Sequence, residues 1–433
     1  MPHSNDIAPQ KDAAVGRIQG WIVSREKKDK NSILLNVLKG DTASIITLIV
    51  NKEEHPYIYS LLERVRRGAA IDVVVHEEEK TGGYRIASIT MINEPENPPS
   101  NNIYLRSNRH VIFEYYANSI NDRALLMRNP VIRAIFKIKG EILFAARKIL
   151  RNWGFLEMNF PKIVNVNAES DEVFQISYFD GVAFLAQSPQ LYKQMMMVSV
   201  VPGVFEIAPC FRAKKCITKR HLCEYWEIDV EKNFIYNLDD ILNLIETFII
   251  KVLSYVKRSC REELDIIGVD VKIPNRPLKR ITYAKVIDSL SDEGIDIPYG
   301  SDLRPEHEEL LGEIMYEKGY EMFFITHFPT NLKPFYIMRD DDQTTRSFDL
   351  EYRGLEIASG GQREHRYEVL AKNLISSGRR LETFKPYLEI FRYGIPPHGG
   401  FGLGIERLLM QMLKLGDIRN AVIFPRDFHT ITP

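Results

Sequence analysis

The N-terminal part of the chain alternates short hydrophobic runs with breaks that are rich in charge and glycine. Between residues 15 and 93 the runs have the period-two alternation of strands, and one stretch, PYIYSLLERVRRG, has a helical pattern. The strand-like runs are VGRIQGWIV, SILLNVL, ASIITLIV, AAIDVVVHEE and YRIASITMI. Five strands interrupted by one helix predict an OB-fold β-barrel over 15–93, preceded by an N-terminal tail at 1–14.

The pattern changes after the barrel. The stretch EPENPPSNN (94–102) is rich in proline and asparagine, and we expect a linker or hinge over 94–120. Residues 131–152 then place isoleucines and alanines at helical spacing. Because the period has switched from two to 3.6, a second domain is expected to begin at about residue 121.

This second domain, 121–433, mixes both patterns. The short runs FDGVAFLAQ, VFEIAPCFRA and EYWEIDVEKNF are typical of an antiparallel sheet. Helical patterns recur at 237–260 and 306–318. The expected fold class is α+β, a small barrel followed by a large mixed domain.

The composition is that of an ordinary globular protein, with 45% hydrophobic residues and a formal charge of −1. Because the overall charge attracts no polyanion, any contact with nucleic acid must come from local patches. The sequence contains no run of about 18 or more apolar residues, so no membrane span is predicted. The N-terminus lacks the apolar core of a signal peptide. We therefore expect a cytoplasmic protein.

The cysteines have no C-x-x-C spacing. Two of them, Cys216 and Cys223, lie among lysines and arginines whose charge opposes a bound cation. Reduced thiols are therefore expected here rather than a zinc site.

The stretch FRAKKCITKRHLCEY (211–225) concentrates positive charge. Arg212 offers a planar fork that can hold a phosphate through two hydrogen bonds, and His221 adds a further donor. Tyr225 offers a ring on which a base can stack. The alternative for this stretch, taken alone, is a solvated basic hairpin.

The stretch SFDLEYRGLEIASGGQREHR (347–366) supplies oxygen ligands. A strand and the following turn could bring Asp349, Glu356 and Ser359 together, and two carboxylates with a hydroxyl suit Mg²⁺, although purely structural acids are the alternative. In GGFGLGIERLLM, Arg407 lies in the first turn of an expected helix. A phosphate-binding arginine, a magnesium site and a second arginine describe a nucleotide enzyme, and the chain has no P-loop.

Four ordered motifs carry a family resemblance. They are QSPQLYKQ (187–194), FRA…KRHLCEY…DVE (211–231), FDLEYRGLEIASGGQREHR (348–366) and FRYGIPPHGGFGLGIERLLM…FPRD (391–427). The chain resembles class IIb aminoacyl-tRNA synthetases, and most closely the aspartyl enzymes of the archaeal and eukaryotic type. The resemblance implies a catalytic domain of antiparallel sheet flanked by helices, and a homodimer formed through the 131–161 helix–strand element.

The resemblance also implies a reaction, an aspartate–tRNA ligation that consumes ATP with Mg²⁺. The amino-acid carboxylate attacks the α-phosphate of ATP, and the resulting aspartyl-adenylate passes its acyl group to the 3′-terminal ribose of tRNA. Catalysis of this kind is mostly positioning and neutralisation of charge.

Roles carried over from the family fall on fifteen positions. The catalytic residues would be Arg212, His221 and Arg407. ATP would contact Arg212 at the α-phosphate, His221 at the γ-phosphate, Tyr225 at adenine, and also Glu356 and Arg407. Mg²⁺ would be held by Asp349, Glu356 and Ser359. Aspartate would be bound by Glu169, Ser188, Gln190, Lys193, Ser359 and Arg363. Contacts to tRNA would come from Trp21, Arg25 and Lys214.

Specificity for aspartate would depend on Lys193 and Arg363. Two fixed cations that converge on one side chain favour a carboxylate, because an amide would leave them unpaired and desolvated. Archaeal asparaginyl enzymes resemble QSAQLYLE in this segment and lack the lysine. The alternative is a surface lysine on an amphipathic helix.

Four segments depart from the family pattern, and in the C-terminal tail Thr430 stands in place of the usual basic residue. Motif FRAK places Lys214 where the family has a carboxylate, and two cations about 5 Å apart repel by roughly 3 kcal/mol. The loop NAESDEVF (167–174) is one residue shorter than usual and lacks its glycine hinge, so its closure over the amino acid is expected to differ. In the barrel, 30–38 and 43–49 supply Ile, Leu and Thr instead of the aromatic and glutamine that read the anticodon.

These departures leave the acceptor open. The first hypothesis is an aspartate–tRNA ligase, with relaxed choice of anticodon. The second is a divergent relative that adenylates aspartate for an acceptor other than tRNA. The third is an inactive RNA-binding or regulatory homologue, against which the retained Arg212, His221, Glu356 and Arg407 argue.

Overall fold

The computed structural model describes residues 16–40, 42, 44–78, 83–99, 103, 109–166, 168–169, 172–215 and 218–432. The expected tail at 1–14 and Cys216 lie outside these residues. The chain divides into two compact units, Met1–Ser107 with Leu125–Ile132, and Asn108–Ala124 with Arg133–Pro433.

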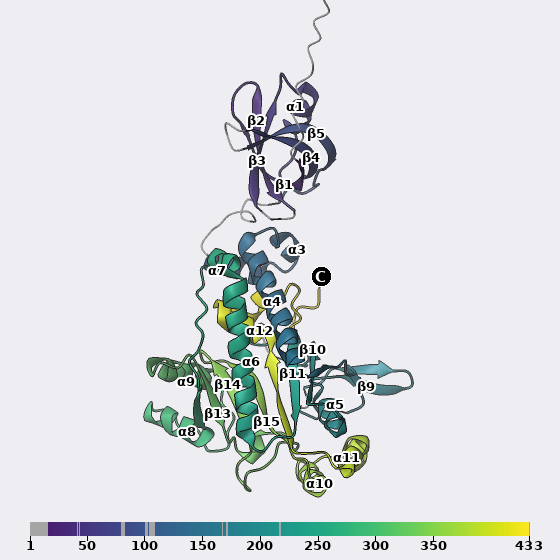
Figure 1. The fold of residues 1–433 in the computed structure, drawn as a ribbon, viewed down its shortest axis with the longest axis vertical. Coiled ribbons are helices and arrows are strands. Elements are labelled where there is room, and N and C mark those ends of the chain that lie inside the picture. The colour runs from purple at the N-terminus through teal and green to yellow at the C-terminus, as the bar shows by residue number, and fades with distance from the viewer. Residues whose placement is uncertain are drawn as a thin grey trace, which may run out of the picture. The chain divides into compact units, whose positions relative to one another are not determined.

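The first unit contains a closed five-stranded barrel, as the sequence predicts (Figure 1). Its elements are β1 (Gly16–Lys27), β2 (Ser32–Lys39), β3 (Ile45–Asn51), α1 (Pro56–Leu62), β4 (Ala70–Glu78) and β5 (Gly83–Asn93). The strands pair in the order β1-β2-β3-β5-β4, and β4 returns to β1. Alternate residues such as Leu35, Val37 and Val73 point inward and are completely buried, which is why the period of two closes into one apolar core.

Helical segments precede the main sheet. They are α2 (Arg109–Asn118), α3 (Arg123–Leu126) and α4 (Pro130–Asn152). Helix α2 lies within 94–120, so part of the range that was expected to be a linker is helical. Helix α4 matches the expected helix at 131–152, and its Ile135, Ile138 and Ile142 are fully buried.

An eight-stranded sheet forms the centre of the second unit, in the order β12-β13-β14-β15-β16-β11-β10-β6. Its pairs are antiparallel except β12–β13 and β10–β6. The strands are β6 (Leu156–Glu157), β10 (Gly203–Phe211), β11 (Glu224–Asn233), β12 (Lys279–Thr282), β13 (Met322–Thr326), β14 (Ser347–Tyr352), β15 (Glu356–Gln362) and β16 (His398–Gly404). A smaller sheet, β7-β9-β8, consists of β7 (Ile163–Val164), β8 (Gln175–Tyr178) and β9 (Gly181–Leu185).

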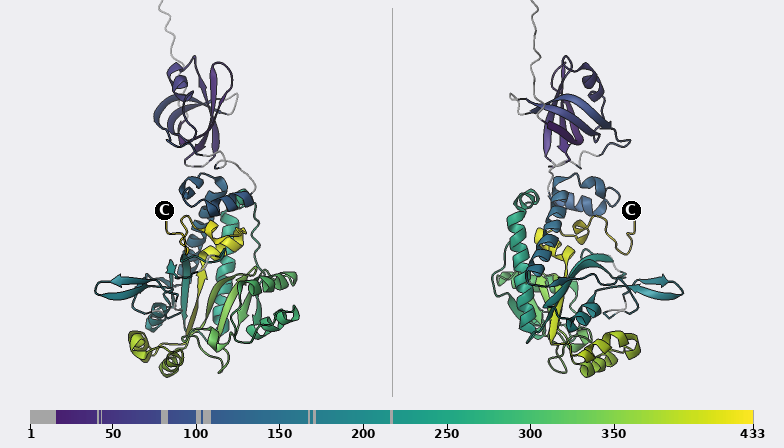
Figure 2. Two further views of the ribbon diagram at one scale, coloured as in Figure 1. Left: turned by 180° about the vertical axis from the view of Figure 1, so that it is seen from behind. Right: turned by 45° about the vertical axis from the view of Figure 1, so that its right-hand side comes forward.

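Helices surround this sheet, as the α+β expectation requires (Figure 2). The longer ones are α6 (Leu238–Ser259), α9 (Pro305–Glu317), α8 (Tyr283–Asp292), α10 (Tyr367–Ser376) and α12 (Ile405–Leu413). The shorter ones are α5 (Gln190–Met195), α7 (Arg261–Ile267) and α11 (Lys385–Ile390), with 3₁₀ turns at Met196–Val198, Thr330–Leu332, Leu381–Phe384, Phe391–Tyr393 and Ile418–Ala421. No helix among the described residues is long and apolar enough to cross a membrane.

The two faces of strand β11 differ in chemistry, and this difference positions the site. Ile228 and Val230 are fully buried in the apolar core. On the same side of the sheet, Phe248 of α6 contacts Phe401 of β16, with ring centroids 6.0 Å apart. Because side chains alternate along a strand, Glu227, Asp229 and Glu231 point to the opposite face. That face therefore carries the charged groups.

Candidate active site

A cavity of about 330 Å³ lies on this charged face of the sheet, entirely within the second unit. Its walls come from β11, β15, β16, α5 and the start of α12, together with the segments that follow β10 and precede β14. Of the fifteen residues with an expected role, all line this cavity except Asp349 and the barrel residues Trp21 and Arg25. These lining residues are Glu169, Ser188, Gln190, Lys193, Arg212, Lys214, His221, Tyr225, Glu356, Ser359, Arg363 and Arg407.

Arg212 follows directly after β10 and is fixed from several sides. Its backbone N–H donates to the carbonyl of Cys223 at 2.9 Å, which holds the start of the basic stretch against β11. Its Nη2 lies 3.3 Å from Glu169 Oε2, and its guanidinium carbon is 5.9 Å from the centroid of the Tyr225 ring. The side chain is nevertheless 45% exposed, so its donors can reach a ligand in the cavity.

Lys214 lies beside His221, with Nζ 3.2 Å from Nε2. Burial, followed by the charges of Arg407 and Lys214, lowers the pKa of His221 to about 3. The ring is therefore neutral at pH 7, and because an ammonium can only donate, Nε2 accepts from Lys214. Nδ1 then carries the hydrogen and donates to Thr218 Oγ1 at 2.6 Å. Lys214 thus meets a neutral acceptor at His221.

The expected magnesium ligands divide into two groups. Glu356 and Ser359 line the cavity, whereas Asp349 lies behind it and accepts from Lys333 Nζ at 2.7 and 2.8 Å. Asp349 and Ser359 are direct partners across β14 and β15. Burial opposes ionisation of Glu356, but Arg407 and Lys333 outweigh it and hold the pKa of this carboxyl below its usual value. An ionised carboxylate and a hydroxyl at the cavity wall fit Mg²⁺, which takes few protein ligands when it also binds phosphates.

Arg407 lies at the end of the cavity that Glu356 lines. Its Nη1 donates to the backbone carbonyl of Glu356 at 2.7 Å and lies 3.6 Å from the carboxylate of that residue. Because α12 begins at Ile405, immediately after the glycine-rich strand β16, Arg407 is placed in the first turn as the sequence predicts.

Lys193 is not a surface lysine, since only 2% of it is exposed. Its Nζ lies 2.9 Å from Asp229 Oδ1, 3.6 Å from Glu231 Oε2 and 3.3 Å from the carbonyl of Phe401. Arg363 is equally buried and donates to both oxygens of Glu231, at 3.1 and 3.4 Å. The two cations therefore share one buried carboxylate and lie side by side in the wall.

Glu169 connects Arg212 with Ser188, which lies just before helix α5. It accepts from Ser188 Oγ and pairs with Arg212. The backbone N–H of Gln190 donates to Ser188 Oγ at 3.2 Å, and the Gln190 side chain donates to Gln194. Three residues of the short loop, 167, 170 and 171, lie outside the described residues, so the expectation of altered loop closure stays a prediction.

The barrel residues expected to contact tRNA are engaged within their own unit. Arg25 donates to the carbonyls of Glu63 and Val65. The guanidinium carbon of Arg128 lies 4.7 Å from the centroid of the Trp21 ring. Their role in binding RNA stays a prediction.

Several charged residues of the site had no role in the sequence prediction. Glu227, Asp229 and Arg220 line the cavity, and Glu231 and Glu308 form ion pairs with residues that do. The alternation E-x-D-x-E in EYWEIDVE could have indicated the three acids, since it places them on one face of a strand. Lys333 has no local signal, because it comes from an irregular segment before β14.

The chain is similar to known proteins along its whole length. Residues 117–428 match the family model described as tRNA synthetases class II (D, K and N). The Aspartate--tRNA(Asp) ligase of Pyrococcus furiosus is 39% identical over 443 residues, covering 100% of this chain and 99% of that protein. The Aspartate--tRNA(Asp/Asn) ligase of Methanopyrus kandleri is 36% identical with the same coverage.

Solved structures agree with this similarity. The asparaginyl-tRNA synthetase of Pyrococcus horikoshii complexed with asparaginyl-adenylate superposes with a TM-score of 0.84 at 28% identity, covering 96% of each chain. The aspartyl tRNA synthetase of Entamoeba histolytica gives a TM-score of 0.82 at 27% identity, covering 96% of this chain and 89% of that one. The expected architecture, an OB-type barrel and a class II synthetase core, is thereby confirmed.

Proposed function

This chain is a member of the class II tRNA synthetases (D, K and N), and on that premise we propose that it is an aspartate–tRNA ligase. In the first step an oxygen of the aspartate α-carboxylate forms a bond to the α-phosphorus of ATP, and the bond to pyrophosphate breaks. In the second step a hydroxyl of the terminal tRNA ribose attacks the acyl carbon, loses its proton, and AMP leaves.

The buried pair Lys193 and Arg363 carries the proposal for aspartate. Both line the cavity and are almost completely buried, and each already pairs with a buried carboxylate, Lys193 with Asp229 and Arg363 with Glu231. A carboxylate side chain gives these donors charged acceptors, whereas an amide presents one neutral oxygen and two hydrogens. Sites built around buried donors reject the ligand that leaves them unpaired.

Chain residues at the other end of the cavity suit the triphosphate. Arg212 would bind the α-phosphate and the attacking carboxylate, and Arg407 would contact the distal phosphates. His221 would reach the γ-phosphate by turning its Nδ1–H away from Thr218. Glu356 and Ser359 would hold Mg²⁺, which when bound would neutralise charge on the phosphates, while Asp349 would stay behind them, bonded to Lys333. Positioning and neutralisation of charge are the main sources of rate in such a reaction.

The acceptor is proposed to be aspartate tRNA. Full-length relatives are named for tRNA(Asp) or for tRNA(Asp/Asn), which favours tRNA over another acceptor and leaves the asparagine tRNA as a second candidate. We also propose a homodimer formed through residues 131–161. Strand β6 is an edge strand of the main sheet, and the exposed Leu156 and Phe144 give this segment an apolar surface.

Two assays on the full chain test the proposal. We expect aspartate-dependent ATP–pyrophosphate exchange and aspartylation of purified tRNA(Asp). Exchange without aspartylation would reject tRNA as the acceptor and favour the divergent relative. Absence of both activities would reject the enzyme itself.

A further inference from the structure

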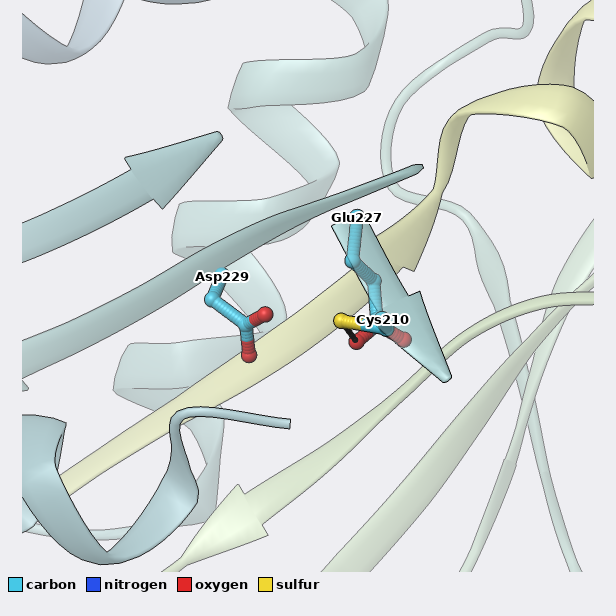
Figure 3. Close-up of side chains that lie close together, drawn as sticks. All are labelled: Cys210, Glu227 and Asp229. Atoms are coloured by element: carbon cyan, nitrogen blue, oxygen red, sulfur yellow. Dashed lines mark hydrogen bonds between the residues drawn. The ribbon is translucent and has the colours of Figure 1, made fainter. Parts of the chain in front are cut away.

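A compact group of three side chains, Cys210, Glu227 and Asp229, lies at the amino-acid end of the cavity, where the two acids line the wall and Cys210 lies beside them outside the lining (Figure 3). Cys210 comes from β10 and the two acids from β11. One sulfur or oxygen atom of each lies within 4.8 Å of those of the others, and the Cys210 thiol donates to Glu227 Oε2 at 3.4 Å. None of the fifteen expected roles uses this group.

Glu227 differs from the other acids around it in having no cation of its own. Asp229 pairs with Lys193, Glu231 with Lys193 and Arg363, and Glu169 with Arg212. Within the described ranges Glu227 forms no ion pair, and its hydrogen-bond partner is a thiol, which is a weak donor. A half-buried carboxylate in this position is poorly compensated.

The charges that face Glu227 determine its protonation. Burial and then the neighbouring charge of Asp229 raise the pKa of Glu227 to about 8, with a smaller rise from Glu169, and Arg212 and Lys193 only partly oppose this. On the β10 side it faces the thiol of Cys210, whose pKa burial raises well above its usual value. On the β16 side it faces Gly402, which has no side chain to titrate. Glu227 is therefore mostly uncharged at pH 7.

The proposed substrate explains why an uncharged acid fits here. Aspartate carries two carboxylates and one ammonium, so it enters with a net negative charge. Beside Glu227 the amino-acid end already balances Lys193 and Arg363 against two carboxylates, those of Asp229 and Glu231. An ionised Glu227 would make this end negative before an anionic ligand arrived, whereas a protonated Glu227 adds a donor.

A metal ion does not suit the same group. The ammonium of Lys193 is already bonded to Asp229, and the thiol of Cys210 stays protonated, so neither the charge nor the sulfur ligand that a metal needs is free. An uncharged acid beside an anionic ligand, by contrast, leaves every neighbour satisfied.

We propose that Glu227 binds the substrate in its protonated form, donating a hydrogen bond from its carboxyl O–H to a carboxylate oxygen of aspartate. This inference rests on the proposed aspartate activation. The proton stays on Glu227, so the residue binds and orients the ligand and takes no part in bond breaking. Loss of the proton removes the donor and places a negative charge against the ligand.

The test is the pH dependence of kcat/KM for aspartate in pyrophosphate exchange between pH 6.5 and 9, with saturating ATP. Because only the protonated fraction binds, kcat/KM for the natural protein is expected to fall about tenfold between pH 7 and pH 9. Glu227→Gln keeps a donor that cannot ionise, and its profile is expected to be flat. Glu227→Leu lacks the donor and is expected to lose about 10- to 100-fold at pH 7.

The matched control is Glu224→Gln, which changes an exposed carboxylate on the same strand and should keep the fall of the natural protein. A fall that persists in Glu227→Gln would overturn the inference. A flat profile in the natural protein would also overturn it, and this result does not depend on the folding of any variant. If the natural protein shows no exchange with aspartate at any pH, the proposed function itself fails, which is a distinguishable result.

Discussion

The two ends of the cavity hold their cations in different ways. At the amino-acid end Lys193 and Arg363 are 2–3% exposed and tied to buried carboxylates. At the nucleotide end the side chains of Arg212 and Arg407 are 45% and 24% exposed, and His221 is uncharged. Buried cations penalise a ligand that leaves them unpaired, whereas partly solvated ones can bind phosphates and release pyrophosphate again. One end thus suits selection of the amino acid, and the other suits turnover.

The largest effect is expected for Lys193→Leu, which removes a buried cation from the amino-acid end. Asp229 loses its partner, so aspartate-dependent exchange should fall by at least about 10³-fold and the free energy of unfolding by about 3–5 kcal/mol. ATP binding, measured by titration, should stay within a few-fold and shows that the variant is folded.

The control for this change is Lys372→Leu, at an exposed position on α10. It should leave both aspartate-dependent exchange and ATP binding unchanged. Exchange that is unchanged in Lys193→Leu would remove the basis for the difference between the two ends.

A smaller effect is expected for Arg363→Lys, which keeps the charge and removes the planar fork. A lysine cannot donate to both oxygens of Glu231 and also reach the ligand in the same geometry, so kcat/KM for aspartate should fall about 10²-fold with KM for ATP unchanged. Arg366→Lys is the matched control, because Arg366 pairs with Glu364 and does not line the cavity. Equal effects of the two substitutions would contradict the assignment.

The smallest effect is expected at the nucleotide end, for Lys214→Glu. Replacing a cation beside His221 by a carboxylate favours the charged ring, so the pKa of His221 should rise from about 3 by about 1–3 units. The ring then gains its proton at a higher pH as acid is added, which an NMR titration of the histidine C–H signals detects. Lys215→Glu, at the exposed neighbour, should leave that titration in place. No shift in Lys214→Glu would mean that Lys214 does not govern the ring.

Much of this arrangement could be predicted from the sequence, because the motifs are local. Strand alternation identified the five-stranded barrel, and ordered motifs identified Arg212, Lys193, Arg363 and Arg407. The partners of these residues depend on which strands lie side by side. Glu231 meets Arg363 only because β11 and β15 both pair with β16, and no spacing in the sequence encodes that neighbourhood.

Helix α2 illustrates the same limit at the level of the fold. Its apolar residues, Ile112, Phe113 and Tyr116, follow a stretch rich in proline and asparagine, so the whole range 94–120 was expected to be a linker. The helix is stabilised by tertiary packing rather than by local signals. Tyr116 and Arg123 lie against the C-terminal part of the chain, where Arg123 donates to the carbonyls of Arg419 and Val422.

The most direct measurement compares aspartate with asparagine in ATP–pyrophosphate exchange by the natural protein. Because asparagine would present a neutral amide instead of a carboxylate to the buried Lys193 and Arg363, we expect kcat/KM to be about 10⁴-fold higher for aspartate. Comparable values for the two amino acids would contradict the account, because the buried pair would then play no part in choosing the substrate.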